Sequence, residues 1–204
     1  MNKQKMKLVT LLLIVTLLFS NTCTVAAASK NVTKTYRKTV SKMLGKLDDS
    51  LGKSCDQYHV FKYDIYTRTA IACSLNYVWG HTIKEVNKMC AKDMKLYFGT
   101  TKMKFKKFKG YERQKNPAYL YRNKGGKVIY IGGDWGEYIP KGKVIKIVQK
   151  NSNKFEVKYN MYLYEGYGKN KKKLGYMGTY KIALKKAKNQ NGFIITDMKL
   201  TKKV

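Results

Sequence analysis

The chain has 204 residues and a formal net charge of +31, because 43 Lys and Arg residues outnumber 12 Asp and Glu residues. Beyond the first 28 residues no segment is apolar enough to span a membrane, and the remaining length suits a single domain. Lys far exceeds Arg, which argues against the bidentate readout of phosphates and base edges that Arg provides. The composition therefore predicts no specific nucleic-acid partner.

A secretory signal peptide is the first predicted element. Basic residues precede an apolar stretch over residues 8–19, and Ala26 and Ala28 fit the small-residue cleavage rule. The stretch is shorter than the roughly 20 apolar residues of a membrane span, which disfavours an uncleaved anchor or a buried helix. We therefore expect residues 1–28 to be removed and residues 29–204 to form one secreted, extracellular or cell-wall-associated domain of net charge +28.

In an exported protein, a lysine-rich surface predicts diffuse attraction to polyanions. An anionic cell-wall or surface polymer is the expected partner, with anionic lipid headgroups, acidic glycans and extracellular nucleic acid as further polyanions of the same class. The competing interpretation is compositional drift, because Lys, Asn, Tyr and Ile are all abundant and Lys also promotes solubility.

The first helix is predicted over residues 33–47, where apolar side chains recur at spacings of three and four. The segment DDSLGKSCDQ then predicts a break, because Asp, Ser and Gly interrupt that spacing. A second helix is predicted from about Tyr58 or Phe61 to Trp79. Trp79 belongs to its apolar arc, and Gly80 is its expected C-terminal cap.

A capping box predicts where the third helix begins. Thr82 is followed three residues later by Glu85, an apolar stripe continues from there, and Gly99 ends the helix. The second and third helices are expected to form an antiparallel hairpin.

Three cysteines remain after the signal peptide, and an oxidising compartment permits one disulfide. Cys73 and Cys90 lie at similar heights on the two sides of the predicted hairpin and form the preferred pair, with Cys55–Cys90 as the alternative. No CxxC, HExxH or calcium-loop spacing occurs, so we predict neither a metal site nor a cofactor.

From Lys102 the hydrophobic period changes from helical to two. The segments KMKFKKF, KVIYIGG, KVIKIVQ, FEVKYNMYLY, YMGTYKIAL and FIITDMKL read as strands separated by turn sequences. Phe155, Val157 and Tyr159 are expected on the covered face of one such strand, and Tyr162 and Tyr164 on the other. About three N-terminal helices packed on a curved antiparallel sheet of five to six strands make an α+β fold.

The glycine-rich stretch YIGGDWGEYIP lies between two predicted strands. A phosphate-binding glycine loop must open onto a helix, and Pro140 with a new strand follows here instead. The stretch therefore predicts a bulge or a tight connection. Trp135 and Tyr138 are expected either to pack over the end of the sheet or to line the rim of a pocket.

The order of elements, with LYFG ending the last helix, GDWG between strands and the closing strand GFIITDMKL, resembles the NTF2-like (cystatin-like) cone folds. Small secreted proteins of Gram-positive bacteria with this layout look similar. The resemblance implies a curved sheet wrapped on the helices, with a conical cavity at one end. Members of the family include enzymes, ligand binders and interaction modules, so the resemblance implies no single function.

Acid–base chemistry is the weaker functional prediction, because it needs two groups that converge on a substrate. His59, Asp64 and Asp134 are the residues that an enzyme of this fold would use. Asp64 is equally well explained as a helix-surface acid near Arg68, and His81 as a turn residue. No catalytic residue is assigned.

The leading prediction is a non-enzymatic binding or interaction domain. The candidates for a ligand in the conical cavity are Trp135, Tyr138, Tyr162 and Tyr164. The candidates for binding a polyanion are Lys102, Lys104, Lys106, Lys107 and Lys109.

Two other functions stay open beside the enzyme. A cationic adhesion or antimicrobial factor would concentrate its lysines on one face of the molecule. A homodimer through the open face of the sheet is also compatible with the pattern.

Overall fold

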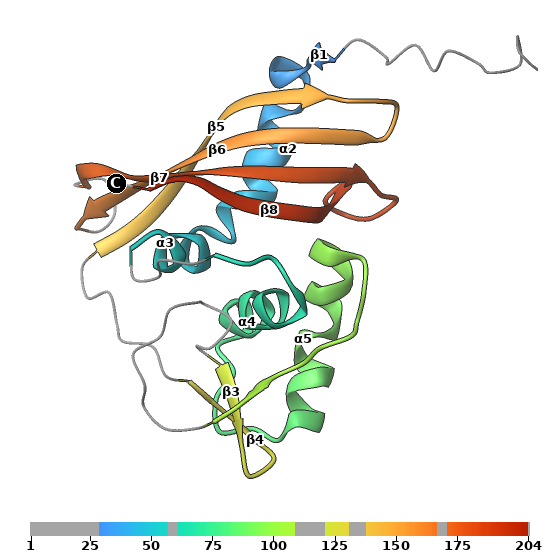
Figure 1. Cartoon of the computed structure of the whole chain (residues 1–204), viewed down its shortest axis with the longest axis vertical. Coiled ribbons are helices and arrows are strands. Elements are labelled where there is room, and N and C mark those ends of the chain that lie inside the picture. Colours follow the sequence, from blue (N-terminus) through green and yellow to red (C-terminus); the bar gives the residue numbers. More distant parts are fainter. Residues whose placement is uncertain (1–28, 57–60, 109–120, 131–137, 167–170, 204) are drawn as a thin grey trace, which may run out of the picture.

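The computed structural model describes residues 29–56, 61–108, 121–130, 138–166 and 171–203 (Figure 1). The expected signal peptide, residues 1–28, lies outside the described residues. So do four of the candidate residues named above, namely His59, Lys109, Asp134 and Trp135.

The described chain is an α+β structure with a five-stranded antiparallel sheet and four helices. The helices are α2 (Thr33–Gly45), α3 (Asp48–Asp56), α4 (Ile65–Asn76) and α5 (Ile83–Phe98). The sheet has the order β1 (Lys30–Asn31), β5 (Tyr138–Gln149), β6 (Lys154–Glu165), β7 (Lys172–Lys186) and β8 (Phe193–Lys203). A smaller sheet contains β2 (Lys106–Lys107), β3 (Tyr121–Lys124) and β4 (Lys127–Tyr130).

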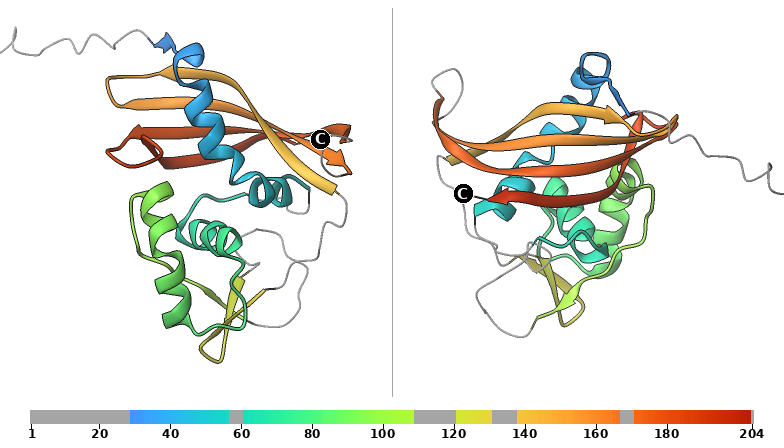
Figure 2. Two further views of the ribbon diagram at one scale, coloured as in Figure 1. Left: turned by 180° about the vertical axis from the view of Figure 1, so that it is seen from behind. Right: turned by 45° about the horizontal axis from the view of Figure 1, so that its top comes forward.

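The helices lie on one side of the five-stranded sheet. Helix α2 contacts β5, α3 contacts β5, β6 and β7, and α5 contacts β8. In Figure 1 α2 passes behind the sheet, and the view from behind in Figure 2 shows it in front. No described helix covers the other face, which we call the outer face.

The segment that predicted a break after the first helix is helical, so that prediction was wrong. Helix α3 begins there with Asp48 and Asp49 in its first turn, where the helix dipole favours acids. Leu51 and Cys55 of α3 are fully buried. Burial against the sheet thus outweighs the low helix propensity of Asp, Ser and Gly.

The second predicted helix is shorter than expected. Asp64 caps α4 by accepting hydrogen bonds from two backbone amides, and the helix ends at Asn76 with Tyr77 in the left-handed region at φ 50°. The chain then pairs with β4, because the Gly80 amide donates to the Val128 carbonyl at 2.7 Å. Trp79 is therefore 61% exposed, which corrects its predicted place in the core.

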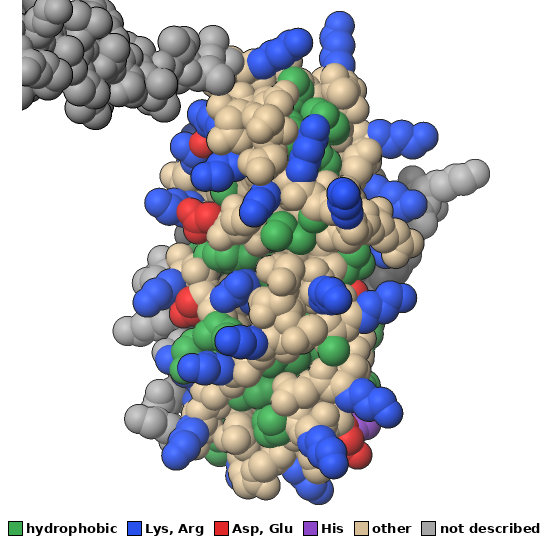
Figure 3. Space-filling view, turned by 90° about the vertical axis from the view of Figure 1, so that its right-hand side faces the viewer, with side chains coloured by type: hydrophobic (Ala, Val, Ile, Leu, Met, Phe, Trp, Pro, Cys, Tyr) green, Lys and Arg blue, Asp and Glu red, His purple; other side chains and the backbone are tan. Residues whose placement is uncertain are grey.

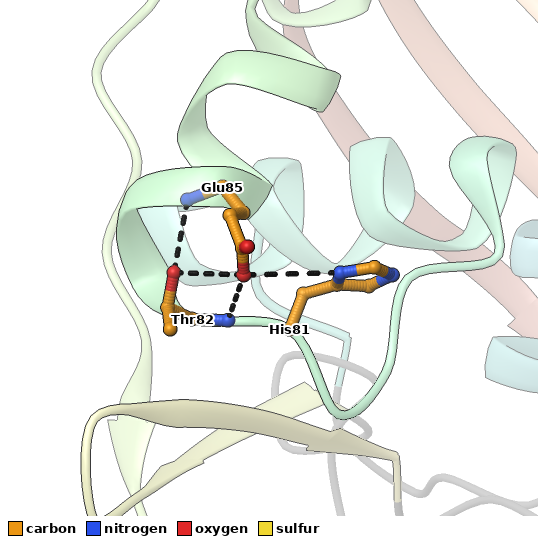
Figure 4. A network of polar contacts seen from close by, with 3 residues as sticks. All are labelled: His81, Thr82 and Glu85. Atoms are coloured by element: carbon orange, nitrogen blue, oxygen red, sulfur yellow. Dashed lines mark hydrogen bonds and ion pairs between the residues drawn. The ribbon is translucent and has the colours of Figure 1, made fainter.

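The third predicted helix is confirmed at both ends. The Glu85 amide donates to Thr82 Oγ1 at 3.3 Å, and the Thr82 amide donates to Glu85 Oε2 at 2.7 Å (Figure 4). Gly99 ends α5 in the left-handed region.

The period-two patterns are confirmed in the five-stranded sheet and fail near Lys102. In β6, Phe155, Val157 and Tyr159 are buried as predicted, and this inner face makes the main contact with the helices. The expected strand from Lys102 is reduced to the two residues of β2, which pair with β3 in parallel. The structure thus has one more helix than expected and a second small sheet.

Helix α3 approaches the sheet closely enough that glycine is required in the contact. A Cβ atom on Gly52 would overlap the Pro140 ring, and one on Gly142 would overlap the Tyr159 ring. The hydroxyl of Tyr180 in β7 donates to the Leu51 carbonyl at 3.0 Å, which ties the same helix to the sheet.

Replacement of Gly52 by Ala is expected to destabilise the fold, although Ala is the better helix former. Helix propensity favours Ala by about 1 kcal/mol, whereas overpacking against Pro140 costs about 1–3 kcal/mol. The measurement is urea unfolding. Gly45→Ala in α2 is the matched control, because the nearest atom to the added Cβ is Asp48 Oδ2 at 3.9 Å. The stability of this variant should be unchanged or slightly higher. Equal midpoints for both variants would contradict the close contact.

Candidate functional site

The outer face of the five-stranded sheet is the candidate functional site. Exposed lysines dominate it across four neighbouring strands. They are Lys141, Lys143, Lys146, Lys154, Lys158, Lys173, Lys181, Lys185, Lys199 and Lys202. The outer face of β5 to β8 carries two carboxylates, those of Glu156 and Asp197.

Four of these lysines form a row perpendicular to the strands. Lys146 pairs with Lys158, Lys158 with Lys181, and Lys181 with Lys199. We call these four residues the lysine row. Neighbouring strands lie about 4.8 Å apart, so the row extends over roughly 14 Å.

The lysine row is poorly neutralised. Lys181 Nζ lies 2.9 Å from Glu156 Oε2, which also lies 3.8 Å from Lys150 Nζ. Within the described residues, Lys146, Lys158 and Lys199 make no ion pair. Like charges directly opposite each other on adjacent strands are destabilising, so the row opposes folding unless an anion lies against it.

A cluster of tyrosines and small polar residues lies beside the lysine row. The rings of Tyr162 and Tyr176 meet edge to face at 5.8 Å, and Lys173 Nζ lies 3.7 Å from the centre of the Tyr162 ring. The Tyr176 and Thr179 hydroxyls are 2.5 Å apart, and Thr179 Oγ1 donates to Asn160 Oδ1 at 2.7 Å. Asn160 Nδ2 completes the chain by donating to the Tyr162 hydroxyl at 3.3 Å. The cluster is therefore held in one arrangement before any ligand binds.

The predicted ligand-binding tyrosines are only partly brought together. Tyr162 and Tyr164 occupy outer-face positions, and Tyr164 pairs with Lys173. Tyr138 shares the strand side of Pro140 and Val144, which is the inner face, and is 44% exposed near the strand end.

Tyr176 is the member of the cluster that sequence reasoning missed. Strict alternation places Tyr176 on the same face as Tyr180, which is buried in the core. A bulge in β7 between Tyr176 and Gly178 reverses the alternation and turns Tyr176 to the outer face opposite Tyr162. Gly178 adjoins the bulge, and a glycine inside a strand pattern is the signal that could have indicated it from sequence.

The lysines predicted to bind a polyanion lie elsewhere. Lys102 and Lys104 belong to the segment that connects α5 to the small sheet, and the Lys104 amide donates to Thr69 Oγ1 at 3.1 Å. Lys106 and Lys107 form β2, where Lys106 Nζ lies 4.0 Å from the centre of the Tyr66 ring. None of the four belongs to the strands that carry the tyrosine cluster.

The residues considered for acid–base chemistry make local structural contacts. Asp64 accepts hydrogen bonds from the amides of Tyr66 and Thr67 as an N-cap. His81 lies at the start of α5, where its Nδ1 is 3.8 Å from Glu85 Oε2 (Figure 4). Hydrogen bonds from the Thr82 amide and hydroxyl lower the pKa of Glu85. In the described part of the chain, no three His, Cys, Asp or Glu side chains are grouped as metal ligands would be.

A buried acid–phenol pair joins α3 to the inner face of the sheet. The Tyr159 hydroxyl donates to Asp48 Oδ1 at 2.6 Å, and the two residues are 1% and 5% exposed. Burial raises the pKa of Asp48, although the hydrogen bonds from Tyr159 and the Gly142 amide oppose that shift. Burial and the neighbouring carboxyl also raise the pKa of Tyr159. Because the pair is closed to solvent, its role is structural.

Because the folded-state pKa of Asp48 is raised, the folded protein binds the Asp48 proton more tightly than the unfolded chain does. The contribution of Asp48 to the free energy of unfolding is fully present below pH 3.8, its ordinary pKa. It is lost as the pH rises through the raised pKa and the carboxyl ionises in the folded protein.

Tyr159→Phe removes a donor to the carboxylate and should destabilise the protein by about 2 kcal/mol at neutral pH and by less in acid. Urea unfolding between acid and neutral pH measures the difference. Tyr180→Phe is the control, because the Tyr180 hydroxyl donates to the Leu51 carbonyl, which does not titrate. The loss of stability in this variant should therefore be the same at every pH. A pH-independent loss in Tyr159→Phe would contradict the pairing with Asp48.

The three described cysteines are buried thiols. Interaction with the Cys73 thiol lowers the pKa of Cys90, and burial raises the pKa of Cys73, so the two thiols are neighbours. Cys90 Sγ donates a hydrogen bond to the Ala72 carbonyl at 3.5 Å. The Cys73 side chain is fully buried. Cys55 lies beneath β7, where a Cβ atom on Gly178 would be 3.0 Å from its sulfur.

We expect oxidation to join Cys73 to Cys90 and to leave Cys55 as a thiol, because the first two thiols are buried neighbours. Refolding with oxidised glutathione supplies the oxidant, which takes up the two electrons and two protons that the thiols release. Peptide mapping without reduction measures the pairing. A Cys55–Cys90 peptide would show that the alternative pairing is correct.

Comparison of the chain with protein-family models, curated proteins and solved structures found no match. Among the described residues, no helix has the length and apolar character needed to cross a membrane.

Proposed function

We propose that this protein is a secreted, non-enzymatic domain that binds anionic cell-envelope polymers through the outer face of its five-stranded sheet. The lysine row is the observation that supports the proposal. Four cations in register across four strands repel one another, and a polyanion laid across the strands removes that repulsion.

The chemistry of lysine suits a polymer that carries one charge on each repeating unit. Its ammonium group is a hydrated point charge on a flexible stem, so it follows a chain of anions without demanding one geometry. The row is flanked by Lys143 and Lys202, which pair across the sheet with Asn160 and Thr179 of the tyrosine cluster. Anions are thus attracted along a band of the sheet, and the attraction weakens as salt screens it.

The tyrosine cluster supplies a surface for the uncharged parts of the same polymer. Tyr162 and Tyr176 are partly buried, and their hydroxyls are bound within the network of Asn160 and Thr179. An aromatic surface held rigid in this way binds without a large loss of side-chain entropy.

An NTF2-like architecture remains part of the proposal. Helices on one face of a curved antiparallel sheet support it, and the described inner face is occupied by side chains bonded to α3, such as Tyr159 and Tyr180. The small sheet of β2, β3 and β4 is an addition to the layout that the resemblance implies.

The other functions considered have weaker support. A dimer through the outer face would bring lysine rows of two copies together, which is electrostatically unfavourable. A cationic adhesion or antimicrobial factor predicts lysines on one face, yet Figure 3 shows Lys and Arg over the whole length of another side of the molecule. For an acid–base enzyme, no acidic and basic side chains among the described residues are seen to converge on one site.

The test replaces the four residues of the lysine row together by Gln and measures binding to long-chain polyphosphate across a salt series. Each lysine that contacts the polymer contributes about one unit to the salt slope, so affinity should fall at least about tenfold and the slope by about three to four. The chain from residue 29 onward is used, because it contains every described element.

The matched control replaces Lys34, Lys38, Lys42 and Lys46, which are exposed along α2, by Gln. This variant has the same net charge as the first and should keep most of the affinity. Equal losses in both variants would mean that net charge alone attracts the polymer. Binding to neutral dextran that survives high salt would favour a ligand in the cone instead.

A further inference from the structure

The end of the molecule opposite the five-stranded sheet carries two exposed aromatic side chains. Tyr77 is 78% exposed and Trp79 is 61% exposed, in the connection between α4 and α5. Among the described residues these are the two most exposed large hydrophobic side chains. The hairpin of β3 and β4 lies at the same end (Figure 1).

The backbone holds both aromatic side chains outward. Tyr77 occupies the left-handed region that favours Gly or Asn, yet its side chain gains little burial in return. The Val128 amide donates to the His81 carbonyl at 2.8 Å, and the Ile83 amide donates to the Gly126 carbonyl at 3.0 Å. The connection is therefore fixed to the hairpin, and the exposure of the two rings is built into the fold.

Exposed lysines lie on the elements that adjoin the connection carrying the two rings. Lys124 and Lys127 lie on the hairpin and Lys84 in the first turn of α5, and all three are exposed. Lys127 pairs directly with Thr82. The nearby carboxylate of Glu85 is already bound to the amide and hydroxyl of Thr82 (Figure 4). We call Tyr77, Trp79, Lys84, Lys124 and Lys127 the aromatic tip.

We propose that the aromatic tip is an anchor that inserts into the headgroup region of an anionic lipid bilayer. Trp and Tyr prefer the boundary between water and hydrocarbon, because each ring is apolar with one polar group. Lysines around them are attracted to acidic headgroups. With the outer face at the other end, one molecule binds an anionic polymer and a membrane surface at the same time.

The occupant is a bilayer and not a glycan because of what surrounds the rings. The acid and hydroxyl nearest the tip, Glu85 and Thr82, bond to each other in the capping box, whereas the exposed lysines favour acidic headgroups. Glu85 is ionised, because the hydrogen bonds from Thr82 lower its pKa, but the three exposed lysines of the aromatic tip outnumber it.

The test follows the fluorescence of Trp79 in the chain from residue 29 onward. Trp135→Phe leaves Trp79 as the single tryptophan of the chain. Vesicles of phosphatidylcholine with phosphatidylglycerol should shift its emission to shorter wavelength, and bromine-labelled acyl chains should quench it. Pure phosphatidylcholine vesicles should do neither, because they carry no net charge.

Variants separate the tip from the rest of the surface. Trp79→Ser and Tyr77→Asn should each weaken partitioning into the anionic vesicles by about tenfold. Asn tolerates the left-handed region, so Tyr77→Asn should keep or raise the urea midpoint while it loses membrane affinity. Tyr138→Ser, which removes another exposed tyrosine, should leave partitioning unchanged.

Three results would overturn the anchor. Vesicle binding without a shift in Trp79 emission would mean that lysines elsewhere attract the lipid. Undiminished partitioning of both tip variants would show the same. A shift produced by a neutral glycan and not by vesicles would assign the rings to sugar binding. Each result is independent of polyphosphate binding, which does not involve Trp79.

Discussion

The close docking of α3 against the five-stranded sheet is the contact on which the arrangement of this protein depends. Gly52 lets the helix lie against the Pro140 ring, and Gly142 leaves room for the Tyr159 ring. Asp48 and Tyr180 form the hydrogen bonds that become possible at that separation. Because α3 contacts β5, β6 and β7, a single helix sets the position of three strands. A buried carboxyl at this contact is tolerated because a phenol donates to it.

Docking on one side leaves the other side of the sheet to solvent. With the helices on the inner face, the outer-face positions of four long strands are free to carry charge. The same strands that bury Phe155, Val157 and Tyr159 therefore align the lysine row on their opposite side. The stability of the inner face offsets the repulsion of the outer face, which allows the protein to keep a binding surface that is unfavourable by itself.

The tyrosine cluster and the aromatic tip both depend on irregular backbone. A bulge in β7 places Tyr176 opposite Tyr162, and the left-handed conformation of Tyr77 begins the connection that exposes Trp79. Pattern reasoning assumes regular periods, so it placed Trp79 in the core and did not identify Tyr176. It succeeded for Thr82, Glu85 and Gly99, because caps are local contacts within a few residues.

The sequence by itself determined the α+β class, the capping of α5 and the alternation of β6, because periodicity and capping act between residues close in the chain. Tertiary structure decided which lysines share a row and that residues 48–56 form a helix. Strand register joins residues far apart in the chain, and bulges shift it by single residues. The lysine row of the candidate site is formed by the register between four strands, so it can be identified only in the folded sheet.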